Sequence, residues 1–227
     1  ALRGNIETEL AAPADGAGCG CAYPEWVDDG TVERSNRILE RLRVAARRFP
    51  AALERLAALP MHLAATVGGE RVAVVHGDAD SLAGWGFSQE ALATPAGRSV
   101  APRAFEAARA RIFASSHSCL PVMHEFPGGR VIANNGAAGM PNFRGTAYGL
   151  ATRISVYASR TAIYRSKAGN VVAEAIPLEY DDAAWQRRFA AQWPAGSDAW
   201  RSYHERMVNG PAYGMEQALR RGPALAA

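Results

Sequence analysis

Two short apolar stretches, each followed by a histidine, most constrain how this chain can fold. "VAVVHGD" places four apolar residues before His76, and "IFASSHSCLP" places a similar run before His117. Short apolar runs bounded by Gly, Ser and Asp are typical of strands. One histidine after a strand is more often structural than functional. Because strand ends in layered α/β folds converge on a shared crevice, however, two such histidines indicate a candidate site.

The first half of the chain combines such strands with amphipathic helices. Apolar residues recur at helical spacing after Thr31, which predicts a helix capped by Thr31 and ended by Pro50, with a second helix after it. The Gly68-Gly69 pair predicts a tight turn between two strands. Residues 1–25 are rich in Gly, Ala and Pro and are expected to be mostly loop.

The second half is dominated by strands. The predicted strands there cover residues 111–116, 122–126, 130–135, 151–158, 161–166 and 171–180, with helical segments before them at 89–92 and 102–110. This order predicts an α/β fold in which two sheets form a sandwich flanked by helices. Residues 1–180 are expected to form that domain, and residues 181–227 a helical C-terminal extension packed on it.

Composition excludes several classes of protein. The 25 basic and 22 acidic residues are interspersed, so a nucleic-acid partner is not expected. There is no apolar run of about 18 residues, so no membrane-spanning helix is predicted. Three cysteines do not suggest a disulfide framework, and a cytoplasmic location is the default expectation. Cys19 and Cys21 are either plain loop cysteines or ligands of a soft metal ion.

Four segments, taken in order, resemble motifs of the calcineurin-like metallophosphoesterase superfamily. They are "RGNIE" around Asn5, "VVHGD" around His76, "SHSCLP" around His117, and "NNGAAGMP" at residues 134–141. The last resembles a strand end of the small bacterial phosphodiesterase branch. Each motif is short and weakly specific, whereas their order and spacing over residues 1–180 are more specific. The resemblance implies an αββα sandwich of two sheets.

The resemblance also implies a set of metal ligands. Asn5, His76 and His117 would bind one divalent transition metal ion, and Cys119 would replace the usual second histidine of its motif at another. Imidazole and oxygen ligands suit Mn, Zn, Fe or Ni, and a thiolate would favour the softer of these. Two ions are expected in the intact protein. The alternative for Cys119 is a small buried thiol on a turn.

Two features depart from the family pattern. Ile6 stands where many members have the histidine that protonates the leaving group, although some members of the small phosphodiesterase branch also lack it. The Asp-x-His and Gly-Asp-x-x-Asp motifs are missing, which suggests that an N-terminal segment has been lost. Without the bridging aspartate, this chain is expected to bind at most one metal ion, weakly. Loss of the first strands would also expose a sheet edge, so a homodimer is predicted.

The predicted function is therefore that of a metal-dependent phosphoesterase. It would hydrolyse small phosphodiesters, or phosphomonoesters, through a metal-activated hydroxide. Arg144 could bind the phosphate in a bidentate manner, or it could be a solvated loop residue. Asp78 and Asp80 could orient His76 or simply form an Asp-rich turn. The alternative function is a catalytically degenerate phosphoesterase fold that acts as a binding or interaction module.

Overall fold

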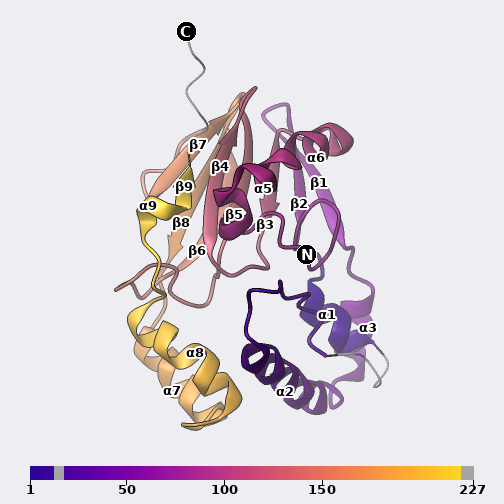
Figure 1. The fold of residues 1–227 in the computed structure, drawn as a ribbon, viewed down its shortest axis with the longest axis vertical. Coiled ribbons are helices and arrows are strands. Elements are labelled where there is room, and N and C mark those ends of the chain that lie inside the picture. Colours follow the sequence, from indigo (N-terminus) through magenta and orange to yellow (C-terminus); the bar gives the residue numbers. More distant parts are fainter. Residues whose placement is uncertain (13–17, 221–227) are drawn as a thin grey trace.

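The computed structural model describes residues 1–12 and 18–220, and it consists of two β-sheets with helices around them (Figure 1). Residues 13–17 of the predicted loop and residues 221–227 of the predicted extension lie outside the described residues. The predicted α/β fold with two packed sheets is confirmed.

The larger sheet has six strands in the order β1-β2-β3-β5-β4-β9. Its central strands β2, β3 and β5 run parallel to one another, whereas β1 and β4 are antiparallel to their neighbours β2 and β5. The strands are β1 (His62–Val67), β2 (Glu70–Val75), β3 (Ile112–Ser115), β4 (Pro121–Phe126), β5 (Arg130–Asn135) and β9 (Leu219–Arg220). The turn between β1 and β2 requires glycine, since Gly68 and Gly69 both have positive φ angles, of 55° and 83°.

The smaller sheet has three antiparallel strands in the order β6-β8-β7. These strands are β6 (Gly149–Ser155), β7 (Tyr164–Ala168) and β8 (Val171–Leu178). Its buried side chains form one hydrophobic core with those of the larger sheet, including Ile112 and Val131 from the larger sheet and Leu150 and Val171 from the smaller one. The two sheets are therefore packed face to face.

Helices α4 (Gln89–Ala93), α5 (Pro95–Ser99) and α6 (Ala101–Ala108) belong to the layer on the other face of the larger sheet. Phe105 of α6 packs there against Phe113 of β3, with ring centroids 5.3 Å apart. This second core fixes β3 from the side opposite to the smaller sheet.

A group of helices lies at one end of the sheets (Figure 1). It comprises α1 (Asn5–Ala11), α2 (Asp29–Ala46), α3 (Pro50–Ala57), α7 (Asp182–Gln192) and α8 (Asp198–Asn209). Helices α2 and α8, far apart in sequence, are joined by an ion pair between Arg37 and Asp198 at 2.8 Å. The short helix α9 (Met215–Ala218) leads into β9.

Three local details differ from the predictions, for identifiable reasons. Residues 5–11 are helical, because Gly4 caps a short helix and its N–H donates to the Glu7 carboxylate at 2.7 Å. The cap of α2 is Asp28, whose side chain accepts from the backbone N–H of Thr31, the residue predicted to be the cap. Pro50 begins α3 and does not end α2.

The C-terminal region and the edge of the larger sheet bear on the remaining predictions. The predicted extension contributes a strand, β9, to the larger sheet in addition to its helices. Its description as a separate extension stays a prediction. Strand β1 is an edge strand, and all but one of its six residues are exposed. Pairing of this edge with a second copy also stays a prediction. Within the described ranges, the helices are too short or too polar to cross a membrane.

Candidate metal site

His76 and His117 leave the larger sheet side by side. Strands β2 and β3 pair in parallel register, with Val74 opposite Ala114, and the Ser116 N–H extends this pairing by donating to the His76 carbonyl at 3.0 Å. Both strands therefore end at the same carboxyl edge of the sheet. Nε2 of His76 lies 3.1 Å from Nδ1 of His117.

The turn that carries His117 has an unusual backbone. His117 has a φ angle of +41°, in the left-handed region that non-glycine residues seldom adopt. Its ring packs edge-on against Trp85, with ring centroids 5.3 Å apart. A strained backbone held by surrounding packing is a common feature of functional sites.

Asn5, the first residue of α1, reaches the two histidines from the opposite side. Its Oδ1 lies 2.9 Å from Nε2 of His76, and its Nδ2 donates to the Cys19 carbonyl at 3.1 Å. Because a carbonyl only accepts, the amide nitrogen must face Cys19 and the amide oxygen must face His76. Close packing is needed here, since a Cβ on Gly4 would lie 2.7 Å from Cε1 of His76.

The hydrogen bonds also determine where the protons lie. Nε2 of His117 is 3.1 Å from the Cys21 carbonyl, so in the neutral ring it carries the proton and donates it. Nδ1 of His117 is then left with a free lone pair directed at His76. His76 Nε2 faces this lone pair and the Asn5 oxygen, so without a cation it carries the N–H of the neutral ring. To bind a cation through Nε2, the ring would carry its proton on Nδ1 instead.

Both histidines favour the neutral form. Burial, and next the proximity of His117, lower the pKa of His76 to about 4. Burial also lowers the pKa of His117, although its hydrogen bond to the Cys21 carbonyl and the negative charge of Asp78 oppose the change. Neutral imidazoles at physiological pH are what metal coordination requires.

The trio of Asn5, His76 and His117 fits one divalent cation. It offers one oxygen and two nitrogen donors, separated in sequence but adjacent in space. The bond from His117 Nε2 to a backbone carbonyl is the outer contact that metal-bound histidines usually make. Among residues 1–12 and 18–220, no three His, Cys, Asp or Glu side chains are placed to hold a metal ion. A metal site here therefore needs the Asn5 amide oxygen in addition to the two histidines.

A second cation does not fit in the same way, because the nearby carboxylates are engaged elsewhere. Asp78 accepts hydrogen bonds from the backbone N–H groups of Asp80, Ser81 and Gly86 at 2.9–3.0 Å, so it forms the Asp-rich turn considered from the sequence. Glu7 accepts from the Gly4 N–H. Neither supplies a bridging carboxylate to the trio.

The loop with Cys19 and Cys21 closes the site. The Cys21 carbonyl accepts from both Trp85 Nε1, at 3.0 Å, and His117 Nε2. The Cys21 sulfur lies 3.3 Å from Nδ2 of Asn5. A hydrogen bond from Cys21 lowers the pKa of Cys19 to about 7, whereas that bond and burial raise the pKa of Cys21. The two cysteines are therefore part of the site.

The other predicted site residues form no hydrogen bond with the side chains of the trio in the described part of the chain. Cys119 is exposed rather than buried, and its sulfur contacts the His117 carbonyl at 3.3 Å. Arg144 is exposed, with its backbone N–H bound to the Tyr213 carbonyl. Ile6 lies beside Asn5 on α1 and carries no titratable group. A ligand role for Cys119 and a phosphate-binding role for Arg144 stay predictions.

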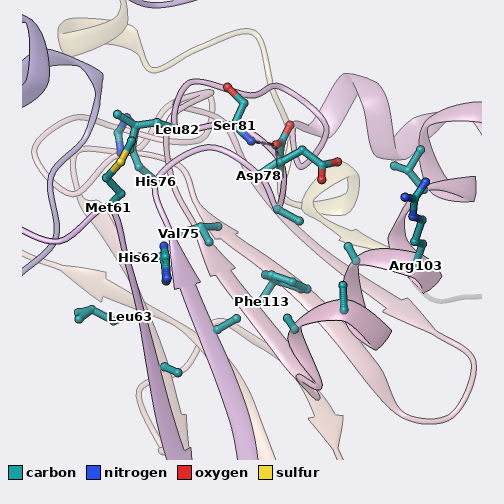
Figure 2. A pocket seen from close by; sticks show the side chains of 18 of the residues that line it. Met61, His62, Leu63, Val75, His76, Asp78, Ser81, Leu82, Arg103 and Phe113 are labelled. Carbon is teal, nitrogen blue, oxygen red and sulfur yellow. Dashed lines mark hydrogen bonds between the residues drawn. The ribbon is translucent and has the colours of Figure 1, made fainter.

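A cavity of about 900 Å³ begins beside His76 and extends along the exposed side of β1 and β2 to α6. In Figure 2, His76 lies with Met61 and Leu82 at one end, and Arg103 of α6 lies at the other. Phe113 and Val75 form part of its floor. Asn5 and His117 are not among its lining residues, so the cavity adjoins the trio without enclosing it.

Sequence reasoning missed two residues of the site, Cys21 in its contact role and Trp85. Their contacts join positions 64 and 96 residues apart, Cys21 with Trp85 and Cys21 with His117. No local pattern reports such pairs. The one available signal was the Cys-Gly-Cys spacing, which suggested either plain loop cysteines or metal ligands and gave no indication of these contacts.

Comparisons with known proteins agree with the fold. No described protein family matches the sequence, and no curated protein matches it. The fold is similar to the crystal structure of the hypothetical protein PH1004 from Pyrococcus horikoshii OT3, with a TM-score of 0.54 and 13% identity over 93% of this chain and 73% of that one. It is also similar to a metallophosphoesterase from Sphaerobacter thermophilus, with a TM-score of 0.54 and 16% identity over 92% of this chain and 76% of that one. The chain therefore has a metallophosphoesterase-like fold.

Proposed function

We propose that this protein is a metal-dependent phosphoesterase that binds one divalent transition metal ion through Asn5, His76 and His117. The observation that carries the proposal is the approach of the Asn5 oxygen and the His117 nitrogen to His76 Nε2, at 2.9 and 3.1 Å. When bound, such a cation polarises a phosphoryl oxygen and lowers the pKa of a coordinated water. The metallophosphoesterase-like fold supports this reading.

The residues of this chain orient the donors and limit access of water. The Cys19 carbonyl holds the Asn5 amide, and the Cys21 carbonyl holds the His117 ring. The Trp85 indole covers one edge of that ring. Donors held in this way bind a cation without a large loss of side-chain entropy.

The proposed substrates are small phosphodiesters with a good leaving group. Ile6 cannot donate a proton at the position where a general acid would act, and such an acid is typically worth about 10²–10⁴-fold in rate. Substrates whose leaving group needs no protonation should therefore react fastest. A phosphate contact by Arg144 is also part of this proposal. It requires the exposed side chain of Arg144 to turn toward the trio.

The test is hydrolysis of bis(p-nitrophenyl) phosphate by the full chain with Mn²⁺ added. We expect turnover that a chelator abolishes and that His76→Ala lowers by at least about 100-fold, because several kcal/mol of transition-state stabilisation would be lost. His204→Ala is the matched control, since His204 lies on α8, where its ring stacks on Trp200 with ring centroids 4.7 Å apart. Equal rates for the wild type and His76→Ala would contradict the proposal.

The alternative is a binding module with a degenerate phosphoesterase fold. The observation that favours it is the engagement of Asp78 and Glu7 with backbone N–H groups, which leaves the trio without a carboxylate. Elemental analysis separates the two functions. A metal content near one ion per chain supports the enzyme, whereas a metal-free protein that still binds a phosphoester supports the module.

A further inference from the structure

The Cys-Gly-Cys loop places two thiols together beside the metal site. Gly20 between them has a φ angle of +61°, in the left-handed region that favours glycine, so the chain turns sharply between the two cysteines. The Cys21 thiol donates to the Cys19 carbonyl, with its sulfur 3.6 Å from that oxygen, so the Cys21 side chain folds back over the residue that carries the other thiol. Both are free in this structure.

The two cysteines differ in how firmly they are held. The Cys19 backbone N–H donates to the Asn36 side chain of α2 at 2.9 Å, and Cys19 is only 4% exposed. Cys21 is half-buried, and its neighbour Ala22 is exposed. Ring closure between the sulfurs would therefore move Cys21 toward a fixed Cys19.

Movement of Cys21 would change the positions of two members of the trio. Its carbonyl orients the His117 ring at 3.1 Å and also accepts from Trp85, and its sulfur contacts the Asn5 amide at 3.3 Å. Cys21 thus contacts two members of the trio, one through its backbone and one through its side chain. A change at Cys21 thus reaches the candidate ligands directly.

We propose that Cys19 and Cys21 form a reversible disulfide, and that this modification weakens metal binding at the adjacent trio. The oxidant is a low-molecular-weight disulfide such as oxidised glutathione. Access decides which sulfur reacts first, because Cys19 is only 4% exposed. The raised pKa of Cys21 makes its thiolate scarce, but that thiolate is the one that glutathione can reach. It attacks the disulfide, a mixed disulfide forms, and one glutathione thiol leaves with the proton that Cys21 gave up. Cys19 then attacks the Cys21 sulfur, the ring closes, and the second glutathione thiol leaves. Two protein thiols are oxidised and one glutathione disulfide is reduced to two thiols.

The formation of the disulfide is independent of the proposed function, whereas its effect on metal binding rests on that function. The experiment uses the full chain with Cys119→Ser, which removes the third thiol, and a second protein that also carries Cys21→Ser. Each is treated with oxidised glutathione. Mass spectrometry of the peptide with Cys19 and Cys21 reports the modification, and calorimetric titration with Mn²⁺, a hard ion that thiols bind poorly, reports the trio.

We expect the Cys119→Ser protein to lose two hydrogen atoms in that peptide and to keep no free thiol. Its Mn²⁺ affinity should fall about 10- to 100-fold, as when an outer contact of a ligand is lost, and should recover on reduction. The protein with Cys21→Ser should not form the ring. Two free thiols after treatment, a stable glutathione adduct on Cys21, or a disulfide with unchanged Mn²⁺ affinity would each overturn the proposal. If the reduced protein binds no Mn²⁺ while the ring still forms, the proposed function fails and the modification site stands.

Discussion

The two sides of the candidate metal site are built in different ways. His76 and His117 follow two parallel strands, and β3 is packed between two hydrophobic cores. Asn5 and the Cys19–Cys21 loop are held by a helix of seven residues and by a few hydrogen bonds. We therefore expect the strand side to set the stability of the protein, and the helix-and-loop side to adjust the affinity of the proposed metal site.

The largest expected effect concerns the strand side. Phe113 of β3 is 2% exposed and packs against Phe87 and Phe105, with ring centroids 5.0 and 5.3 Å away. Phe113→Ala should lower the free energy of unfolding by about 3–5 kcal/mol, because it leaves a cavity in the core. Denaturant unfolding measures this. As a control, Tyr157→Ala, at a residue that is 78% exposed, should change it by less than about 0.5 kcal/mol.

If Phe113→Ala lowered the free energy of unfolding by no more than Tyr157→Ala does, the strand side would not set the stability of the protein and the comparison would be wrong. The same measurement on Cys21→Ser should give a small change, since that residue belongs to the loop side.

The next effect concerns the close approach of α1 to the strand side. Gly4 has a φ angle of −102°, which alanine adopts freely, but the added Cβ would lie 2.7 Å from the His76 ring. Gly4→Ala should displace that ring and weaken Mn²⁺ binding about 10- to 100-fold with little loss of stability. Gly139→Ala is the control, because nothing lies within 4 Å of the new Cβ. Equal Mn²⁺ affinities for the two variants would mean that the packing of α1 against His76 does not affect metal binding.

The third effect is the pH dependence of stability, which the strand side should dominate. Burial, and next the positive charges of Arg98 and Arg220, lower the pKa of His124 on β4 to about 4. An unfolded histidine has a pKa near 6.5, so between these values the unfolded chain binds more protons. The free energy of unfolding should therefore fall as the pH falls from 7 to 5, by on the order of 1 kcal/mol for this residue.

His124→Gln should reduce this slope, and the part that remains should come from His76 and His117, whose pKa values are also lowered. Met123→Ala, on the same strand but in the core between the two sheets, should instead lower stability equally at both pH values because it removes no titratable group. A slope unchanged by His124→Gln would show that the protonated ring is accommodated in the folded protein.

The smallest effect concerns one hydrogen bond on the loop side. Trp85→Phe keeps an aromatic ring beside His117 but removes the indole N–H that donates to the Cys21 carbonyl at 3.0 Å. One such bond contributes about 0.5–1.5 kcal/mol, so Mn²⁺ affinity should fall about 2- to 10-fold. Trp26→Phe, at an exposed tryptophan, is the control. A loss beyond 100-fold would mean that the loop is a primary determinant of the site.

The sequence was informative where the signal is local. Apolar runs, a Gly-Gly turn and histidines just after strands predicted β1 to β8 and the meeting of His76 with His117, because parallel neighbours end at one sheet edge. The short helix α1 was missed, since its cap is a glycine and not a Ser, Thr, Asp or Asn.

The loop side could not be predicted in the same way. The contacts of Cys21 with Trp85 and His117 depend on how the helices at the end of the sheets place the loop, and no periodicity reports that. For the same reason the contact of the Cys21 thiol with Asn5 could not be predicted, and the role of Cys119 at a second ion stays a prediction.

The most direct test of the metal site is an anomalous difference map from a crystal of the full chain soaked in Mn²⁺. We expect one peak about 2.0–2.3 Å from Asn5 Oδ1, His76 Nε2 and His117 Nδ1, and no such peak in His76→Ala. A peak elsewhere in the protein, or none at all at saturating Mn²⁺, would contradict the assignment of these three residues as metal ligands.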